Sequence, residues 1–304
     1  MPRGPRLDVE GGVYHVMARG VERRAIFRDD TDRQNFLRRL EAVAEEEDLA
    51  VFAYVLMDNH FHVVARRGPA PLGQCLRRLL TGHSVVFNRR HRRDGHLFQN
   101  RYRAVLCEAD TYLLQLVRYV HLNPVRAGLV TEPQAYRWSS HAAYLRRGAP
   151  AWLAVQPVLE MIGGRAAYRR FIRDGYGEGA RSDLCGRGVP QDEGTPQVWL
   201  GGQVLGDERF ARRMARAGGW RELQRELEQG RAAELPGLAQ KIAARHRIDL
   251  RVLRGPDRQR VVSAARRALA RAAVVERGIR PVEVSRYLGV SRAAITAQLR
   301  THDT

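Results

Sequence analysis

The stretch VFAYVLMDNHFHVVAR, residues 51–66, decides the fold of the first half of the chain. Its first seven residues, 51–57, form an apolar and aromatic run typical of a buried strand. Asp58 and Asn59 then favour a two-residue turn. Residues 60–66 predict another strand directly after the turn. This stretch therefore predicts a tight β-hairpin.

The segments around the hairpin extend it into an α+β pattern. Residues 13–19 alternate as a strand, and a helix capped by Thr31 is expected to run to about Glu47. After the hairpin, Pro71 opens a Leu-rich helix, and a fourth strand is expected over about 97–107. The order βαββαβ is that of a ferredoxin-like split sheet.

A further helix is expected after the fourth strand. Asp110 is a suitable N-cap, and Pro124 ends the helix after Asn123. The remainder of the chain reads as mostly helical, with a Gly-rich loop or linker over 175–196. The predicted fold class is thus α+β: a split sheet with one added helix, followed by a helical region.

The charge of the chain points to a polyanionic partner. The 304 residues include 52 basic and 33 acidic side chains, a formal net charge of +19, and every basic residue except Lys241 is arginine. Arginine presents a planar fork of donors that suits phosphate, although genome base composition produces the same bias. With 44% hydrophobic residues the chain can build real cores, so a fully disordered basic chain is excluded.

The apolar runs and the cysteines indicate a cytoplasmic protein that does not cross a membrane. No apolar run approaches the roughly 20 residues that span a bilayer, and the charged N-terminus is followed by no apolar signal core. The three cysteines, Cys75, Cys107 and Cys185, are odd in number and widely spaced, which fits neither a disulfide framework nor a zinc knuckle. We therefore expect a reduced, cytoplasmic protein.

The histidines of the hairpin form an H-x-H pair within a strand. Side chains two residues apart on a strand point to one face, so His60 and His62 could bind one divalent cation. Taken alone, the pair is equally consistent with two histidines on a solvated strand face.

Tyr119 is a second candidate. Asn123 follows it by one helical turn, so a phenol and an amide oxygen would project to the same side. The alternative is a core aromatic, because apolar residues surround Tyr119 in the sequence.

Five strings, read together, favour the functional interpretation of both features. They are YHVMARG (14–20), DNHFHVV (58–64), GHLFQNRYR (95–103), RYVHLNPVRAGLV (118–130) and WSS (138–140). Their order and spacing closely resemble the single-tyrosine HUH transposases, in particular the REP-associated tyrosine transposases. The resemblance covers about residues 10–147.

The resemblance implies roles for individual residues. His60 and His62 would bind a catalytic Mg²⁺ or Mn²⁺, and Tyr119 would be the nucleophile. Relatives usually carry Gln as a further metal ligand where this chain has Asn123, one methylene shorter. His121 and His15 are alternatives, but His121 falls on another side of the helix, and for His15 we expect a structural hydrogen-bonding role.

The basic residues between the metal strand and the tyrosine helix suggest a groove for single-stranded DNA. Residues 51–107 hold 10 basic and only 2 acidic residues, and Tyr102 adds an aromatic ring. The alternative is an ordinary solvated face. The candidates for DNA contacts are Arg77, Arg78, Arg89, Arg90, Arg101 and Arg103.

The C-terminal residues 281–299 predict a helix-turn-helix. Gly289 marks the turn and Ser291 caps the second helix, while an earlier helix over about 257–276 completes a three-helix unit. The unit is similar to the C-terminal domain of the bacterial replication initiator; a simple three-helix packing module is the alternative. Its predicted DNA contacts are Arg286, Ser291, Arg292 and Thr296.

These patterns predict a three-part enzyme. We expect a transposase catalytic domain over 8–150, a helical or linker region over 151–240, and a helix-turn-helix DNA-binding domain over 241–304. The enzyme would cleave and rejoin single-stranded hairpin DNA through a 5′-phosphotyrosine intermediate, with duplex DNA as a second partner. A catalytically inactive or domesticated DNA-binding regulator is the alternative. Both a monomer and a homodimer are compatible with the resemblance.

Overall fold

The chain forms two compact units, residues 1–220 and 221–304. The region over 151–240, which was predicted as a separate helical or linker part, is divided between these two units. The functions assigned to the three predicted parts of the chain stay predictions. The predicted linker, 175–196, lies partly outside the described residues. The computed structural model describes residues 7–179, 181, 183–185, 198–199, 202–218, 220–255, 257 and 259–300.

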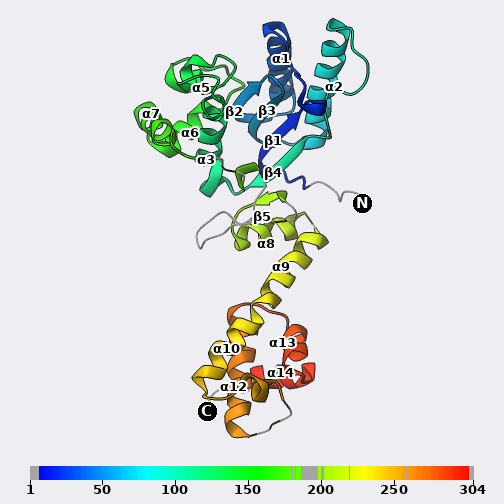
Figure 1. Ribbon diagram of the computed structural model, residues 1–304, viewed down its shortest axis with the longest axis vertical. Helices are drawn as coiled ribbons and strands as arrows, with labels where there is room; N and C mark the ends of the chain where they lie inside the picture. The colour runs from blue at the N-terminus through cyan, green and yellow to red at the C-terminus, as the bar shows by residue number, and fades with distance from the viewer. Residues whose placement is uncertain are drawn as a thin grey trace. The chain divides into compact units, whose positions relative to one another are not determined.

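A six-stranded mixed sheet forms the centre of the first unit (Figure 1). Its strand order is β2-β3-β1-β4-β6-β5, and the first four of these strands have the order of a ferredoxin-like split sheet. The predicted fold class is therefore confirmed. The strands are β1 (Val13–Arg19), β2 (Ala50–Met57), β3 (His60–Arg66), β4 (Arg103–Cys107), β5 (Val198–Trp199) and β6 (Val204–Leu205).

Two details of the sheet differ from the prediction. β4 begins at Arg103 rather than near residue 97, because Phe98 makes only an isolated bridge to Gly20. The short strands β5 and β6 were not expected. β6 pairs in parallel with β4 at Leu106 and Cys107, so the edge of the split sheet is extended by a segment from much later in the sequence.

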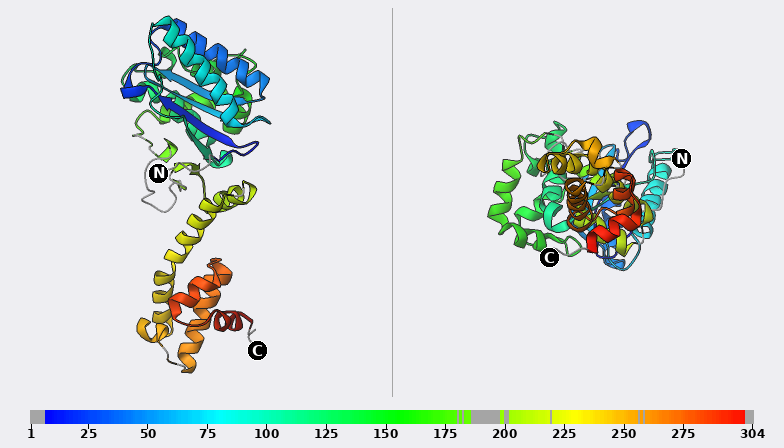
Figure 2. Two further views of the ribbon diagram at one scale, coloured as in Figure 1. Left: turned by 90° about the vertical axis from the view of Figure 1, so that its right-hand side faces the viewer. Right: turned by 90° about the horizontal axis from the view of Figure 1, so that it is seen from below.

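Helices α1 (Asp30–Glu46) and α2 (Leu72–Arg90) lie side by side over one face of the sheet (Figure 2). Phe36 of α1 packs on Phe61 of β3 with ring centroids 4.9 Å apart. The N-cap of α1 is Asp29 rather than Thr31, because the Asp29 carboxylate accepts a hydrogen bond of 3.0 Å from the amide of Asp32.

The opposite face of the sheet is covered by α3 (Ala109–His121). Its N-cap is Glu108 rather than Asp110, and the short helix α4 (Asn123–Arg126) follows with Pro124 in its first turn. Leu116 and Val120 of α3 are completely buried, which fixes the helix on the sheet. The further helices of this unit are α5 (His141–Leu145), α6 (Val155–Ile162), α7 (Arg165–Asp174) and α8 (Glu208–Ala217).

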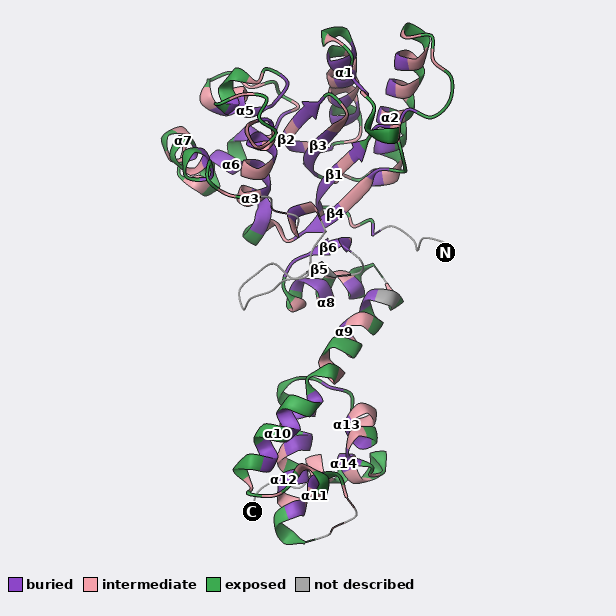
Figure 3. Cartoon of the chain, viewed as in Figure 1, coloured by how far each residue is buried: buried purple, intermediate pink, exposed green. Residues whose placement is uncertain are grey.

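The second unit is helical and has its own core. Leu253, Leu269, Val284, Leu288 and Ile295 are all buried in it. Figure 3 shows purple, buried segments along its helices. No described helix of either unit is long and apolar enough to cross a bilayer. The helices are α9 (Arg221–Ala233), α10 (Leu235–Arg245), α11 (Leu250–Arg254), α12 (Arg260–Arg271) with a π-helical turn over Ala272–Glu276, α13 (Pro281–Leu288) and α14 (Arg292–Arg300).

Candidate active site

The two histidines of the H-x-H motif lie on one face of β3. His60 is paired with Arg19 and His62 with Met17 of the neighbouring strand β1. Their ring centroids are 5.2 Å apart. His62 is buried, whereas His60 is half-buried because it follows the hairpin turn. The strand thus brings two imidazoles close together on the face that α3 covers.

Tyr119 of α3 lies beside His62 of this pair and beside His15 of β1. Its ring centroid is 5.7 Å from that of His62 and 5.8 Å from that of His15. The ring is half-buried, while Leu116 and Val120 of the same helix are completely buried. Tyr119 is therefore at the margin of the core beside the histidines, where a phenol can meet a ligand.

Asn123 also reaches the histidine pair, although it lies in α4 rather than in α3. Its side chain lies close enough to His60 to raise the pKa of that imidazole, against the larger effect of burial. His121, in contrast, is completely buried away from the pair: its Nε2 lies 2.7 Å from Ser140 Oγ and its Nδ1 lies 2.8 Å from the Tyr168 hydroxyl. Among the ligands considered from the sequence, this geometry favours Asn123 over His121.

Both motif histidines are neutral at pH 7. Burial lowers the pKa of His60 to about 4 and the pKa of His62 well below 6.5. The Asn59 amide nitrogen donates to the Arg23 carbonyl, so Asn59 Oδ1 faces His60 and accepts a hydrogen bond of 2.7 Å from its Nδ1. The Nε2 of His60 therefore carries a lone pair.

This donor set fits a divalent metal ion. Neutral imidazoles and a carboxamide oxygen are ligands for Mn²⁺, and Mg²⁺ would need additional oxygen ligands from water or a phosphate. His60, His62 and Asn123 are the residues that would hold the ion.

Two further side chains contact Tyr119, and both have electrostatic effects on its hydroxyl. The Tyr119 hydroxyl is 3.0 Å from the Cys185 sulfur, and burial together with this cysteine raises the pKa of the phenol. Arg126 Nη1 donates to the Tyr119 carbonyl at 2.8 Å, and its guanidinium carbon lies 4.6 Å from the ring centroid. The charge of Arg126 lowers the pKa of Tyr119 and opposes the effect of burial.

Sequence reasoning missed the short segment Asp183–Cys185 at this site. The Leu184 carbonyl oxygen lies 2.7 Å from His15 Nδ1, and Cys185 contacts Tyr119. Ligand atoms of His15, His62 and Cys185 lie within 4.8 Å of one another. No sequence signal indicates this arrangement, because the segment belongs to a Gly-rich stretch outside the recognisable motifs.

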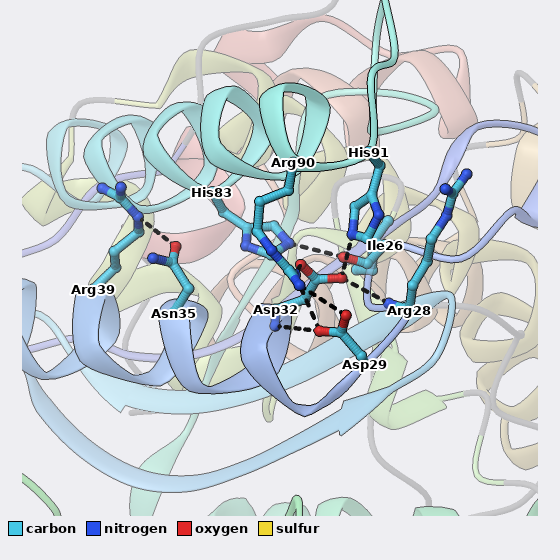
Figure 4. A network of polar contacts seen from close by, with 9 residues as sticks. All are labelled: Ile26, Arg28, Asp29, Asp32, Asn35, Arg39, His83, Arg90 and His91. Atoms are coloured by element: carbon cyan, nitrogen blue, oxygen red, sulfur yellow. Dashed lines mark hydrogen bonds and ion pairs between the residues drawn. The ribbon is translucent and has the colours of Figure 1, made fainter.

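Two of the predicted DNA-binding arginines are engaged within the protein. Arg78 forms ion pairs with Glu46 and Glu47. Arg90 forms ion pairs with Asp29 and Asp32, as Figure 4 shows. The expectation that acidic partners are nearly absent is therefore wrong for these two residues. It failed because the partners belong to α1 or immediately precede it, and α1 packs beside α2.

The other arginines of this group differ in exposure. Arg77, Arg89 and Arg101 are exposed, whereas Arg103 is half-buried and donates to the Gly202 carbonyl at 3.3 Å. A role of these arginines in binding DNA stays a prediction.

The C-terminal unit contains the predicted helix, turn and helix. Gly289 ends α13 with a φ of 67°, a left-handed conformation that favours glycine. Ser291 Oγ then accepts a hydrogen bond of 3.1 Å from the Ala294 amide. Arg286, Ser291 and Arg292 are exposed, and the Thr296 hydroxyl donates to the Arg292 carbonyl.

A cavity of about 340 Å³ lies beside this turn. Arg251 and Arg254 of α11 line it together with Arg286 and Tyr287 of α13. The Arg254 guanidinium stacks on the Tyr287 ring at 4.8 Å. Three arginines around one cavity make this side of the unit suitable for an anion.

One family model matches part of the first unit. A family model described as "Transposase IS200 like" matches residues 8–123. Among solved structures, the chain is similar to a REP-associated tyrosine transposase bound to a REP hairpin, with 18% sequence identity and a TM-score of 0.42. That similarity covers 50% of this chain and 90% of the other. Among curated proteins, no match was found.

Proposed function

We propose that the chain is a DNA transposase with Tyr119 as its nucleophile, because residues 8–123 match the family model described as "Transposase IS200 like". Its substrate would be single-stranded DNA in hairpins or palindromic repeats. The observation that carries the proposal is the position of Tyr119, half-buried beside the His60 and His62 pair.

The proposed step is an in-line attack on a phosphodiester. Tyr119 Oη forms a bond to phosphorus while the bond to the 3′ oxygen breaks, which leaves a 5′-phosphotyrosine and a free 3′ hydroxyl. The phenol loses one proton and the 3′ hydroxyl gains one, so the step balances. Since the linkage conserves the energy of the phosphodiester, attack by another 3′ hydroxyl rejoins DNA without ATP.

The residues around Tyr119 divide the remaining tasks. His60, His62 and Asn123 would hold Mg²⁺ or Mn²⁺, which when bound neutralises charge on the scissile phosphate. Arg126 stabilises negative charge on the tyrosine oxygen and fixes the backbone of the same residue. The exposed Arg77, Arg89 and Arg101 would contact the DNA backbone.

We propose a second DNA contact for the C-terminal unit. In α13 and α14, the exposed Arg286 and Arg292 flank a turn whose conformation and cap are typical of a helix-turn-helix. Such a unit would bind duplex DNA while the first unit acts on a single strand.

The direct test is a covalent adduct. The protein is incubated with Mn²⁺ and a pool of single-stranded DNA hairpins with randomised loops and flanks. The label is on the 3′ end, because the 3′ fragment stays on the tyrosine. We expect a denaturation-resistant adduct that EDTA abolishes and added Mn²⁺ restores.

Two variants decide the result. Tyr119→Phe should form no adduct, whereas Tyr176→Phe, a change at an exposed tyrosine, should react like the wild type. If Tyr119→Phe still forms the adduct, the proposed nucleophile is wrong. If the wild type forms none but binds duplex DNA, the chain acts as a DNA-binding regulator instead.

A further inference from the structure

A buried chain of hydrogen bonds runs from a late segment of the sequence to His62. The Leu184 carbonyl oxygen lies 2.7 Å from His15 Nδ1, and His15 Nε2 lies 2.8 Å from His62 Nδ1. His15 is completely buried, and His62 and Leu184 have exposed fractions of 5% and 1%. Water therefore does not compete for these hydrogen bonds.

The donor and acceptor properties of these groups determine which nitrogen of each imidazole carries hydrogen. A carbonyl oxygen only accepts, so His15 Nδ1 must carry the hydrogen that is donated to Leu184. Both nitrogens of the completely buried His15 ring contact uncharged partners, a carbonyl oxygen and an imidazole, so the neutral ring is favoured and its Nε2 can only accept. His62 Nδ1 must then be the donor in the contact with His15, and His62 Nε2 is left with a lone pair.

The Nδ1 of His60 also has a hydrogen-bond acceptor, which is an amide oxygen rather than an imidazole. This nitrogen donates to Asn59 Oδ1, and the Asn59 amide is oriented by the Arg23 carbonyl. Both histidines of the motif are thus held with Nε2 free of hydrogen. The partner of His60 is the neighbouring residue Asn59. The partner of His62 is His15 on strand β1, and His15 is in turn bound by the Leu184 carbonyl, which lies outside the segment that matches the family.

We propose that His15 is a positioning residue for the metal site, which orients His62 and keeps its Nε2 lone pair available to the ion. The Leu184 carbonyl orients His15 in turn, so a segment beyond residue 123 takes part in the site. This inference rests on the proposed metal site. Outer partners of metal-binding histidines fix the ring and its tautomer, and their loss typically lowers metal affinity by about 10- to 100-fold.

Three variants of the full-length protein separate this role from general packing. His15→Phe keeps a ring of similar size but removes both hydrogen-bonding nitrogens. His15→Gln retains an oxygen that can accept from His62 Nδ1. His83→Phe is the matched control, because His83 is an equally buried histidine with Nε2 2.9 Å from the Ile26 carbonyl.

The first measurement requires no metal and no DNA. Nitrogen-15 NMR of the histidine rings reports which nitrogen of each imidazole carries hydrogen. We expect His62 in the metal-free wild type with hydrogen on Nδ1 only, and a mixture of tautomers in His15→Phe. A wild-type His62 with hydrogen on Nε2 would overturn the inference even if the variants do not fold.

The second measurement is the affinity for Mn²⁺ by calorimetry. We expect His15→Phe to raise the dissociation constant by about 10- to 100-fold, and His15→Gln and His83→Phe to stay within about threefold of the wild type. Equal affinity of His15→Phe and the wild type would overturn the role of His15 but leave the proposed function intact. If a His60→Ala/His62→Ala double variant binds Mn²⁺ as well as the wild type, the proposed metal site fails, and the inference fails with it.

Discussion

At the scale of single residues, Arg126 connects the geometry of the site with its electrostatics. Burial and Cys185 raise the pKa of Tyr119, which makes the phenol a weaker nucleophile at neutral pH. Arg126 opposes this effect, because its guanidinium lies over the Tyr119 ring and donates to the carbonyl of the same residue. Its Nε is buried without a hydrogen-bond partner among the described residues.

Replacing this charge should slow the chemical step. For Arg126→Gln we expect adduct formation to be slower by about 10- to 100-fold, because a hydrogen bond to a charged group contributes about 1.5–3 kcal/mol. Arg126→Lys should recover part of the rate. The rate is measured with the labelled hairpins under single-turnover conditions. An unchanged rate for Arg126→Gln would mean that this charge does not assist Tyr119.

The residues of the site were only partly predictable from sequence. His60 and His62 follow from the alternation of a strand, and Tyr119 follows from motifs that surround it. Leu184 and Cys185 could not be found in this way. Their contacts with His15 and Tyr119 depend on how a Gly-rich segment folds back onto the sheet, and no local pattern encodes such a long-range contact.

At the scale of elements, the junction between α1 and α2 combines a helix cap with an ion-pair network. Asp29 caps α1 and forms an ion pair with Arg90 at the end of α2 (Figure 4). Asp32, which is buried, also binds Arg90 and lies 2.8 Å from His91 Nε2. Arg90 therefore fastens the two helices that cover one face of the sheet.

The junction predicts an acid dependence of stability. Hydrogen bonds from Arg90 lower the pKa of Asp29 from 3.8 to about 2. A carboxylate whose pKa is lowered on folding contributes stability above its unfolded pKa and loses it as the pH falls. The difference in unfolding free energy between the wild type and Asp29→Asn should therefore be present above about pH 4 and disappear near pH 2.

Urea unfolding between pH 2 and pH 7 measures this difference. The exposed Asp94→Asn serves as the control and should follow the wild type throughout. Since the Asp29 side chain is itself 45% exposed, solvent weakens the effect. A constant difference between the wild type and Asp29→Asn over the whole range would show that the cap, not the ion pair, accounts for the contribution of Asp29.

The elements were predictable where their signals are local. The hairpin around Asp58 and Asn59 follows from two apolar strands and a turn pair, and α13 ends at Gly289 as expected. β5 and β6 were missed because two residues carry no periodicity, and their pairing depends on β4 far away in the sequence. The engagement of Arg78 and Arg90 was missed because it depends on the packing of α1 beside α2.

At the scale of the whole molecule, two separate basic regions should give separable DNA-binding activities. The double variant Arg286→Glu/Arg292→Glu should lose most of the affinity for duplex DNA, and its binding should depend less on salt. Adduct formation on single-stranded hairpins should stay within about twofold, because both residues belong to the second compact unit. Fluorescence anisotropy with labelled duplex DNA at several salt concentrations measures the first effect.

A charge-matched control isolates the contribution of the turn. Arg221→Glu/Arg225→Glu changes the net charge equally at exposed positions of α9. If both double variants lose duplex affinity to the same extent, the loss reflects total charge rather than the α13–α14 unit.

The placement of β6 beside β4 also limits how copies of the chain could associate. An uncovered edge strand offers unpaired amide and carbonyl groups to a strand of another molecule. β6 occupies this position at Leu106 and Cys107, so another copy could not continue the sheet from β4 there without first displacing β6. On the opposite side of the sheet, β2 is bridged by Ser139 and Leu153, so a strand of another copy would meet an occupied edge there as well.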